Sequence, residues 1–172
     1  MGFPAKFGAI LLTVIAVCVG AASPSAANGD LVAFNADVAP GTIVIRTSER
    51  RLYLVLADRH ALRYVVGVGK PRSQWAGTAV IDGKYLHPNW APPALVKAEK
   101  PDLPDVIAGG SPANPMGVAA MTLSGGEYAI HGTNAPNSIG GFVSHGCIRM
   151  YNQDISDLFA RVRVGTTVVV TR

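Results

Sequence analysis

Apolar and polar positions alternate along much of the chain after residue 40, as they do in β-strands. In residues 51–56, Leu52, Leu54 and Leu56 fall on one face, and Tyr53 and Val55 fall on the other. Apolar side chains on both faces predict a strand that is covered on both sides. Strands expected from similar patterns span residues 42–46, 51–56, 61–68, 78–81, 84–86, 117–123, 128–131 and 166–171.

Two short links between these expected strands have the composition of turns. Residues 57–59 (Ala-Asp-Arg) predict a hairpin loop between the second and third strands. Asp82-Gly83 is a favoured two-residue hairpin sequence, so it predicts a tight turn between residues 78–81 and 84–86.

One late segment has the period of a helix. Its apolar residues repeat at i, i+3, i+4 and i+7: Ile155, Leu158, Phe159 and Val162. Asn152 is expected to cap this helix, Asp154 favours its first turn, and Gly165 is expected to end it.

Residues 87–115 fit neither period. They contain seven prolines that break regular elements: Pro88, Pro92, Pro93, Pro101, Pro104, Pro112 and Pro115. Long irregular stretches inside a compact domain are usually functional lids or linkers, and strand-like sequence resumes afterwards, so a capping loop is expected. Together these elements predict a mainly β, sandwich-like domain with a Pro-rich capping loop and one late α-helix.

The N-terminal residues have the organisation of an export signal. Lys6 precedes an almost wholly apolar run over residues 7–20, and Ser25 and Ala27 fit a cleavage site before Asn28. Residues 1–27 are therefore predicted to be a signal peptide, 28–40 an N-terminal connector and 41–172 the catalytic domain, working in the periplasm or cell envelope. An uncleaved membrane anchor and a lipidated Cys18 are the alternatives.

Composition narrows the function classes. With 49% hydrophobic and 15% charged residues the chain is not a disordered one. Its formal net charge of +4 comes without a block of like charges, so nucleic-acid binding is not expected. Cleavage would leave Cys147 as the one thiol of an exported protein, which favours a thiol kept for its reactivity.

The candidate chemistry lies around this cysteine. A free thiol is only a few per cent thiolate at neutral pH, so a catalytic cysteine needs a proton acceptor, and His131 and His145 are the candidates. Gly146 leaves the backbone open beside the thiol, so its amide is a candidate oxyanion donor. Gly132 lets a backbone carbonyl approach the His131 ring.

These residues belong to a longer pattern. His131-Gly132-Thr133 is followed by Ser144-His145-Gly146-Cys147-Ile148-Arg149, and supporting matches are Pro88-Asn89-Trp90-Ala91-Pro92-Pro93, Asn114-Pro115-Met116-Gly117 and Val164-Gly165-Thr166. Over residues 42–170 the chain resembles the YkuD-type L,D-transpeptidases, in particular the ErfK/YbiS-like group. One departure is Trp75-Ala76-Gly77-Thr78, where the family more often has Thr-Pro-Thr-Gly-Thr; we expect a turn variation away from the chemistry.

The resemblance implies a role for each matching residue. It implies Cys147 as nucleophile, His131 as general base and the Gly132 carbonyl as the group that orients His131. Arg149 matches a position thought to hold the site or a substrate carboxylate. Ser144 and His145 belong to the motif and are carried as candidate substrate-binding residues, with a scaffold role in the turn favoured for His145.

The resemblance also implies the substrates. The donor would be a peptidoglycan tetrapeptide stem that loses its terminal D-alanine, and the thioester would be resolved by an amine of another stem, giving a 3-3 crosslink. The same acyl-enzyme could instead attach an outer-membrane protein to the wall or be hydrolysed, as in an L,D-carboxypeptidase. A carbapenem is expected to acylate Cys147 as a donor mimic, and neither cofactor nor metal is expected.

Two rivals from other classes remain. His131, His145 and Cys147 could supply three ligands to zinc, as in a zinc-dependent wall hydrolase, although the H-x-C spacing is unusual for zinc. A non-catalytic wall-binding module could keep the fold without turnover, but a mere binding module has no need of a His–Cys pair.

Overall fold

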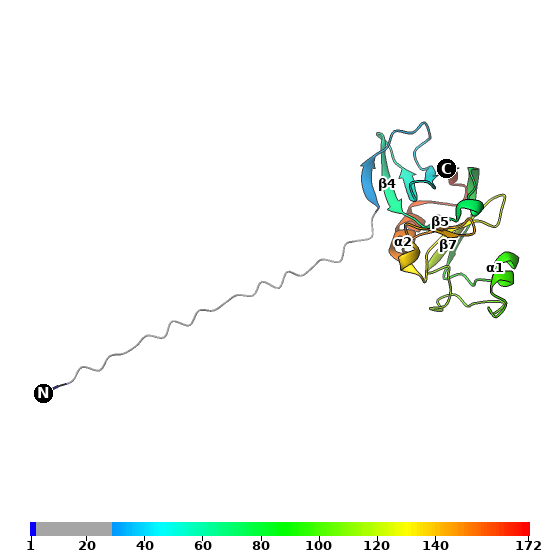
Figure 1. Ribbon diagram of the computed structural model, residues 1–172. Coiled ribbons are helices and arrows are strands. Elements are labelled where there is room, and N and C mark those ends of the chain that lie inside the picture. The colour runs from blue at the N-terminus through cyan, green and yellow to red at the C-terminus, as the bar shows by residue number, and fades with distance from the viewer. Residues whose placement is uncertain (3–28) are drawn as a thin grey trace.

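A large, mostly antiparallel sheet organises the molecule in a computed structural model that describes residues 1–2 and 29–172 (Figure 1). The expected signal peptide and Cys18 thus lie almost wholly outside the described residues. The strands are β1 (Asp30–Ala33), β2 (Ile43–Arg46), β3 (Arg51–Val55), β4 (His60–Val65), β5 (Val68–Gly69), β6 (Gly77–Leu86), β7 (Ala119–Leu123), β8 (Ala129–His131), β9 (Phe142–Ser144), β10 (Ile148–Arg149) and β11 (Thr167–Thr171). The helices are α1 (Ala94–Glu99) and α2 (Asn152–Arg161). In the described part of the chain, no helix is long and apolar enough to cross a membrane.

The long strand β6 joins the two layers of the fold. The main sheet has the order β1-β4-β3-β2-β11-β6-β7-β8-β10. Residues 77–80 of β6 pair with β11, whereas its later residues pair with β7, and the register shifts between Ile81 and Gly83. The predicted hairpin at Asp82-Gly83 is therefore wrong: the dipeptide forms an irregularity inside one strand. Such a bulge bends a strand, which lets β6 pass from one half of the sheet to the other.

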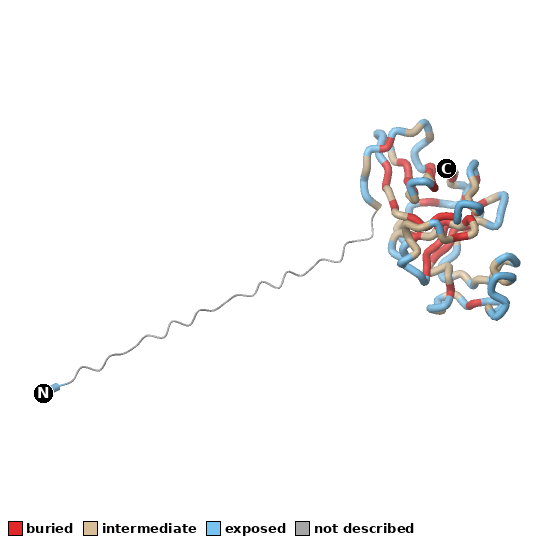
Figure 2. Tube along the Cα trace, viewed as in Figure 1, coloured by how far each residue is buried: buried red, intermediate tan, exposed pale blue. Residues whose placement is uncertain are grey.

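One hydrophobic core lies between the two halves of this sheet and α2, and the predicted mainly β, sandwich-like class is confirmed (Figure 2). Alternate residues of β3 enter it, as the sequence pattern predicts, while Tyr53 and Val55 pack in a second cluster with Phe34. Each fully buried Leu or Ile stabilises the fold by roughly 1.5–3 kcal/mol. Tyr64, buried in β4, donates a hydrogen bond to Asp157 of α2 at 2.6 Å and so fixes the helix on the core.

The N-terminal part of the described chain differs from expectation in one respect. The hairpin loop between β3 and β4 is confirmed, with Asp58 and Arg59 at φ 57° and 58°. However, β1 lies inside the range expected to be a connector and pairs antiparallel with β4. Residues 30–40 also supply Phe34 to the second cluster, so this segment covers an outer face of the sheet.

The late helix is confirmed over Asn152–Arg161, but its expected N-cap is wrong, and it ends at Arg161 and not at Gly165. Asn152 is the first residue of α2, Tyr151 is the N-cap, and no side chain caps the helix. The Asn152 Oδ1 instead accepts a hydrogen bond from the Thr133 N–H at 2.9 Å and one from the Val118 N–H at 3.4 Å. Asn152 thereby joins the start of α2 to the chain that follows β8.

The capping loop, residues 87–115, contains a six-residue helix that the sequence did not predict, α1. Figure 1 places it at the end of the domain away from β4, and most residues of the loop are exposed or half-buried (Figure 2). Its base is closed by the buried Asn114, whose Nδ2 donates to the carbonyls of Pro88, Ile107 and Ala108 at 2.9–3.1 Å. The loop is thus an ordered cap with a fixed base.

Candidate active site

Cys147 lies in a tight turn between β9 and β10. The Ser144 hydroxyl, 2% exposed, donates to the Cys147 carbonyl at 2.6 Å and accepts from the Gly146 N–H at 3.1 Å. Ser144 therefore shapes the turn from inside and does not face the cleft. The Gly146 amide, expected as an oxyanion donor, is already engaged, whereas no hydrogen bond to the Cys147 N–H is recorded among residues 29–172.

The sheet brings the cysteine beside the histidine. Strand β10 runs parallel to β8, with Ile148 opposite Ile130 and Arg149 opposite His131. Both isoleucines are buried in the core, so the residues next to them project from the other face of the sheet. Cys147 continues β10 by one residue on that face. The thiol and the imidazole thus come from the same face of adjacent strands, offset by two residues because Arg149 is the residue opposite His131.

His131 is held in one orientation and kept neutral. Its Nδ1 lies 2.7 Å from the Gly132 carbonyl oxygen, which fixes the proton on Nδ1 and leaves Nε2 as the basic nitrogen. Burial, and then the positive charge of Arg149, lower the pKa of His131 to about 4, against weaker opposition from the Gly132 and Pro115 backbone. Gly132 is needed here because a Cβ would lie 2.3 Å from Asn152 Oδ1.

The thiol is protonated at rest for the same reason. Burial raises the pKa of Cys147, while the Ala129 backbone and the Arg149 charge pull it down. Its Sγ lies 3.9 Å from the Glu127 carbonyl oxygen. A neutral thiol and a neutral imidazole favour proton transfer during attack over a thiolate formed in advance, in line with the need for a proton acceptor that the sequence indicates.

The depressed pKa of His131 predicts how stability depends on pH. The unfolded chain takes up this proton near pH 6.5 and the folded protein only near pH 4, so stability falls as the pH is lowered through this window. The full loss is about 3 kcal/mol below pH 4. We expect His131→Asn to remove this contribution, flattening the dependence of the unfolding free energy, measured by urea denaturation, between pH 6.5 and 4.

An exposed histidine provides the control. His60 lies on the surface at the start of β4, so His60→Gln is expected to keep the wild-type slope. Equal slopes in wild type and His131→Asn would contradict a buried, neutral His131.

Two adjoining cavities lie beneath the capping loop, one beside Cys147 and the other beside Arg149. One, of about 330 Å³, is lined by Cys147, Tyr128 and Val96 of α1. The other, of about 420 Å³, is lined by Arg149 with Lys70 and Lys100. His145 and Val96 line both. A further cavity of about 520 Å³ lies between residues 39–42 and 160–167 and is lined by neither thiol nor imidazole, so it does not mark the active site.

Arg149 lines the second of these cavities and has one unpaired donor. Its Nε is buried and has no hydrogen-bond partner among the described residues. A guanidinium that lines a cavity with a spare donor and two lysines nearby suits a carboxylate. Arg149 also lies close enough to lower the pKa of both Cys147 and His131.

His145 connects the turn between β9 and β10 that contains Cys147, the nucleophile turn, to the capping loop. Its Nε2 lies 3.2 Å from Glu99 Oε2 at the end of α1, and both side chains are partly exposed. The contact stabilises the position of α1 only weakly, because even a charged pair of side chains that reach solvent contributes about 0–1 kcal/mol. His145 therefore lies at the rim of the site, beside Cys147 in sequence but aimed at the cap.

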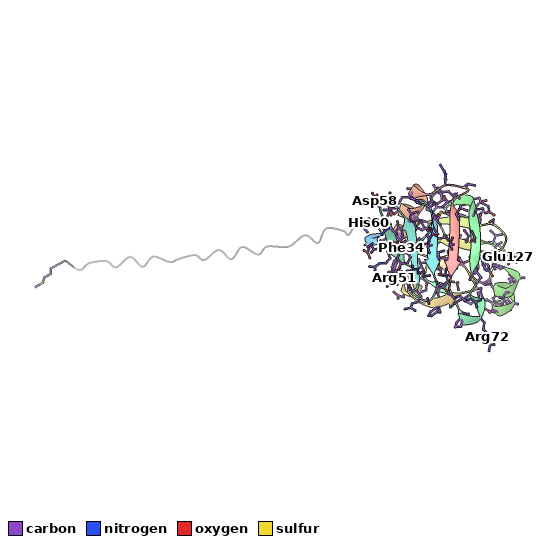
Figure 3. The ribbon with its side chains drawn as sticks, turned by 90° about the horizontal axis from the view of Figure 1, so that it is seen from above. Phe34, Arg51, Asp58, His60, Arg72 and Glu127 are labelled. Atoms are coloured by element: carbon purple, nitrogen blue, oxygen red, sulfur yellow. The ribbon has the colours of Figure 1, made fainter. Side chains whose placement is uncertain are left out.

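The structure adds two aromatic residues that sequence reasoning did not place at the site. Trp75 Nε1 donates to the Gly146 carbonyl oxygen at 3.1 Å, and its ring stacks on Tyr128 with centroids 5.0 Å apart. The expectation that the Trp75 segment is a variation away from the chemistry is wrong. The one signal in the sequence for a special role of this segment was its departure from the family pattern. Glu127, next to Tyr128, lies at the end of the molecule away from Asp58 and His60 (Figure 3).

Candidate metal ligands do not assemble. Within residues 29–172, no three His, Cys, Asp or Glu side chains come together as a metal-binding group. His145 is turned toward Glu99, while His131 is tied to its neighbouring carbonyl, so the three ligands suggested by the zinc alternative are oriented separately.

Comparison with known proteins gives a consistent family. The YkuD profile, described as an L,D-transpeptidase catalytic domain, matches residues 40–170. The chain is 41% identical over 135 residues to a protein of Escherichia coli strain K12 named Probable L,D-transpeptidase YbiS, and 39% identical over 138 residues to Probable L,D-transpeptidase ErfK/SrfK of the same strain. These alignments cover 73% and 74% of the chain but 43% of each relative. The chain thus matches less than half the length of these two relatives.

Solved structures of the same fold have low sequence identity to the chain. L,D-transpeptidase 3 from Mycobacterium tuberculosis has a TM-score of 0.60 at 15% identity, covering 76% of this chain and 60% of its own. The catalytic domain of an L,D-transpeptidase from Enterococcus faecium, acylated by ertapenem, has a TM-score of 0.59 at 19% identity, covering 79% of this chain and 100% of its own. These likenesses confirm the fold.

Proposed function

The chain belongs to the YkuD family of L,D-transpeptidases, and on that premise we propose that it is a cysteine acyltransferase acting on the stem peptides of peptidoglycan. The observation that supports this most is the pairing of β8 with β10, which brings His131 and Cys147 to one face of the sheet, with Cys147 lining a cavity that Val96 of the cap also lines. The proton on His131 Nδ1 is held by the Gly132 carbonyl, so Nε2 is free to accept a proton.

In the acylation step, the Cys147 sulfur attacks the carbonyl carbon that joins the third stem residue to the terminal D-alanine. Its proton passes to His131 Nε2, which the low pKa of the buried ring keeps available as a base. The carbonyl oxygen becomes an oxyanion that the Cys147 N–H is free to bind. When the intermediate collapses, the C–N bond breaks, the imidazolium returns the proton to the amine, and D-alanine leaves a thioester on Cys147.

In the second step, an amine attacks the thioester and restores the thiol. The side-chain amine of another stem gives a 3-3 crosslink. An amine of an outer-membrane protein would attach that protein to the wall, and water would make the enzyme an L,D-carboxypeptidase. The exchange needs no nucleotide because the old amide bond supplies the acyl group.

Arg149 is the residue we assign to a substrate carboxylate. Its buried Nε lacks a partner and its cavity also contains Lys70 and Lys100, so an anionic group would be paired there. His145 is assigned to the rim, where its contact with Glu99 joins the nucleophile turn to α1. Ser144 is assigned to the turn itself.

The place of action is outside the cytoplasm. The pattern of Lys6, the apolar run over residues 7–20 and Ala27 supports cleavage and export to the periplasm or cell envelope. A carbapenem is expected to acylate Cys147, as ertapenem acylates the Enterococcus faecium catalytic domain that shares this fold.

The reaction can be tested directly with the purified protein and disaccharide-tetrapeptides. We expect release of D-alanine together with dimers joined between two third-position residues, detected by chromatography and mass spectrometry. Disaccharide-pentapeptides are the matched control, because their third residue is not followed by a terminal D-alanine. Exclusive use of pentapeptides as donors, or dimers joined through a fourth residue, would overturn the assignment.

A further inference from the structure

Trp75 holds the nucleophile turn from behind. It lines neither of the two cavities that meet at His145, yet its Nε1 donates to the Gly146 carbonyl at 3.1 Å. The ring is nearly parallel to Tyr128, with an interplanar angle of 6°, and both rings pack on the main core.

Gly146 is confined on every side by these neighbours. Its φ is +129°, and a Cβ at this position would lie 2.2 Å from the Tyr128 ring. Its N–H is held by the Ser144 hydroxyl and its carbonyl by Trp75. Both polar groups of one glycine are thus held by side chains that come from separate parts of the chain.

The Gly146 carbonyl and the Cys147 N–H belong to the same peptide group. The described residues contain no cis peptide bond, and across a planar trans peptide the C=O and N–H point in opposite directions. A hydrogen bond that holds the carbonyl toward Trp75 therefore directs the Cys147 N–H away from Trp75. This N–H is the donor without a recorded partner, and it belongs to the residue that carries the reacting sulfur.

We propose that Trp75 is a positioning residue of this enzyme, which aims the Cys147 N–H at the oxyanion by holding the Gly146 carbonyl. The proposal rests on the acyl-transfer function given above. Trp75 touches neither substrate nor thiol. It acts when the carbonyl oxygen of the donor takes up the negative charge, and it has no role in a reaction of the thiol that forms no oxyanion.

That difference gives the experiment. Trp75→Phe keeps an aromatic ring on Tyr128 but removes the donor, and Trp75→Leu removes both. Each variant is assayed for carbapenem acylation, for D-alanine release from tetrapeptides and for alkylation by iodoacetamide, which attacks sulfur without forming an oxyanion. We expect Trp75→Phe to lower the acylation rate and kcat about 10- to 100-fold with KM unchanged, since loss of a whole oxyanion donor costs about 10²–10³-fold. Alkylation of the same sample should change by less than about twofold.

Two other outcomes would contradict the proposal. A parallel fall in alkylation would mean that Trp75 only maintains the fold or the thiol pKa. Normal acylation in Trp75→Phe with a loss in Trp75→Leu would mean that the stacked ring matters and the hydrogen bond does not. If wild type accepts the carbapenem but not tetrapeptides, the substrate proposal fails, while the role of Trp75 is still read from the ratio of acylation to alkylation.

Discussion

Cys147→Ala is expected to abolish D-alanine release and crosslinking and to prevent covalent addition of a carbapenem. The loss should be on the order of 10⁶-fold, as is typical when a catalytic nucleophile is removed. Among the residues that line the two cavities, Cys147 is the one thiol, and the remaining side chains there cannot form the thioester. Product analysis measures turnover, and intact mass measures the adduct.

Cys147→Ser is the matched control for this substitution. It keeps the size of the side chain, and it leaves Ser144 and the backbone hydrogen bonds of the turn in place. The hydroxyl is a far weaker nucleophile, so this variant should also lose turnover while melting at the wild-type temperature. Crosslinking activity retained by Cys147→Ala would refute the assignment of this site.

The alternation of apolar and polar residues predicted a strand correctly where the observed strand pairing and burial agree with that alternation. Leu52 and Leu54 alternate with Tyr53, and each set meets apolar neighbours, because β3 lies between the main core and the cluster around Phe34. The hairpin loop at Asp58 was predictable because the two strands that flank it, β3 and β4, pair with each other.

Errors arose where long-range packing overrides a local preference. Asp82-Gly83 favours a tight turn, yet β6 continues because β11 pairs with its first half and β7 with its second. Asn152 suits a helix cap, but its Oδ1 is used by the amides of Thr133 and Val118. In both cases the competing partners are far away in the sequence: strands β7 and β11 for Asp82-Gly83, and Thr133 and Val118 for Asn152.

The contacts of the candidate site divide in the same way, into local contacts that the sequence indicates and long-range contacts that it does not. The contact of His131 with the Gly132 carbonyl is between neighbours in sequence, so the motif contains it. The contacts of Trp75 with Gly146 and of Glu99 with His145 join segments that are far apart in the chain. A pattern of residue types could give no partner for either, and only the folded arrangement explains why a tryptophan stands in the variant turn.

His131→Ala is expected to lower kcat by about 10²–10⁴-fold, a smaller loss than that of the nucleophile. In the proposed mechanism the ring takes the thiol proton during attack, and burial raises the pKa of Cys147, so few thiolates would form without it. Deletion of the ring leaves a space beside the sulfur, so added imidazole should restore part of the acylation rate. His60→Ala, at an exposed position, is the matched control and should show neither loss nor rescue.

The pH profile separates this base from an ordinary surface histidine. His131 accepts a proton only while it is neutral, and its pKa is lowered to about 4 by burial and by Arg149. The wild-type kcat/KM should therefore stay level as the pH falls through 6.5 and decline only near pH 4, as long as near-ultraviolet circular dichroism reports folded protein. His131→Ala should lack that acid limb. A decline centred near pH 6.5 in the wild type would contradict a buried, neutral His131 as the catalytic base.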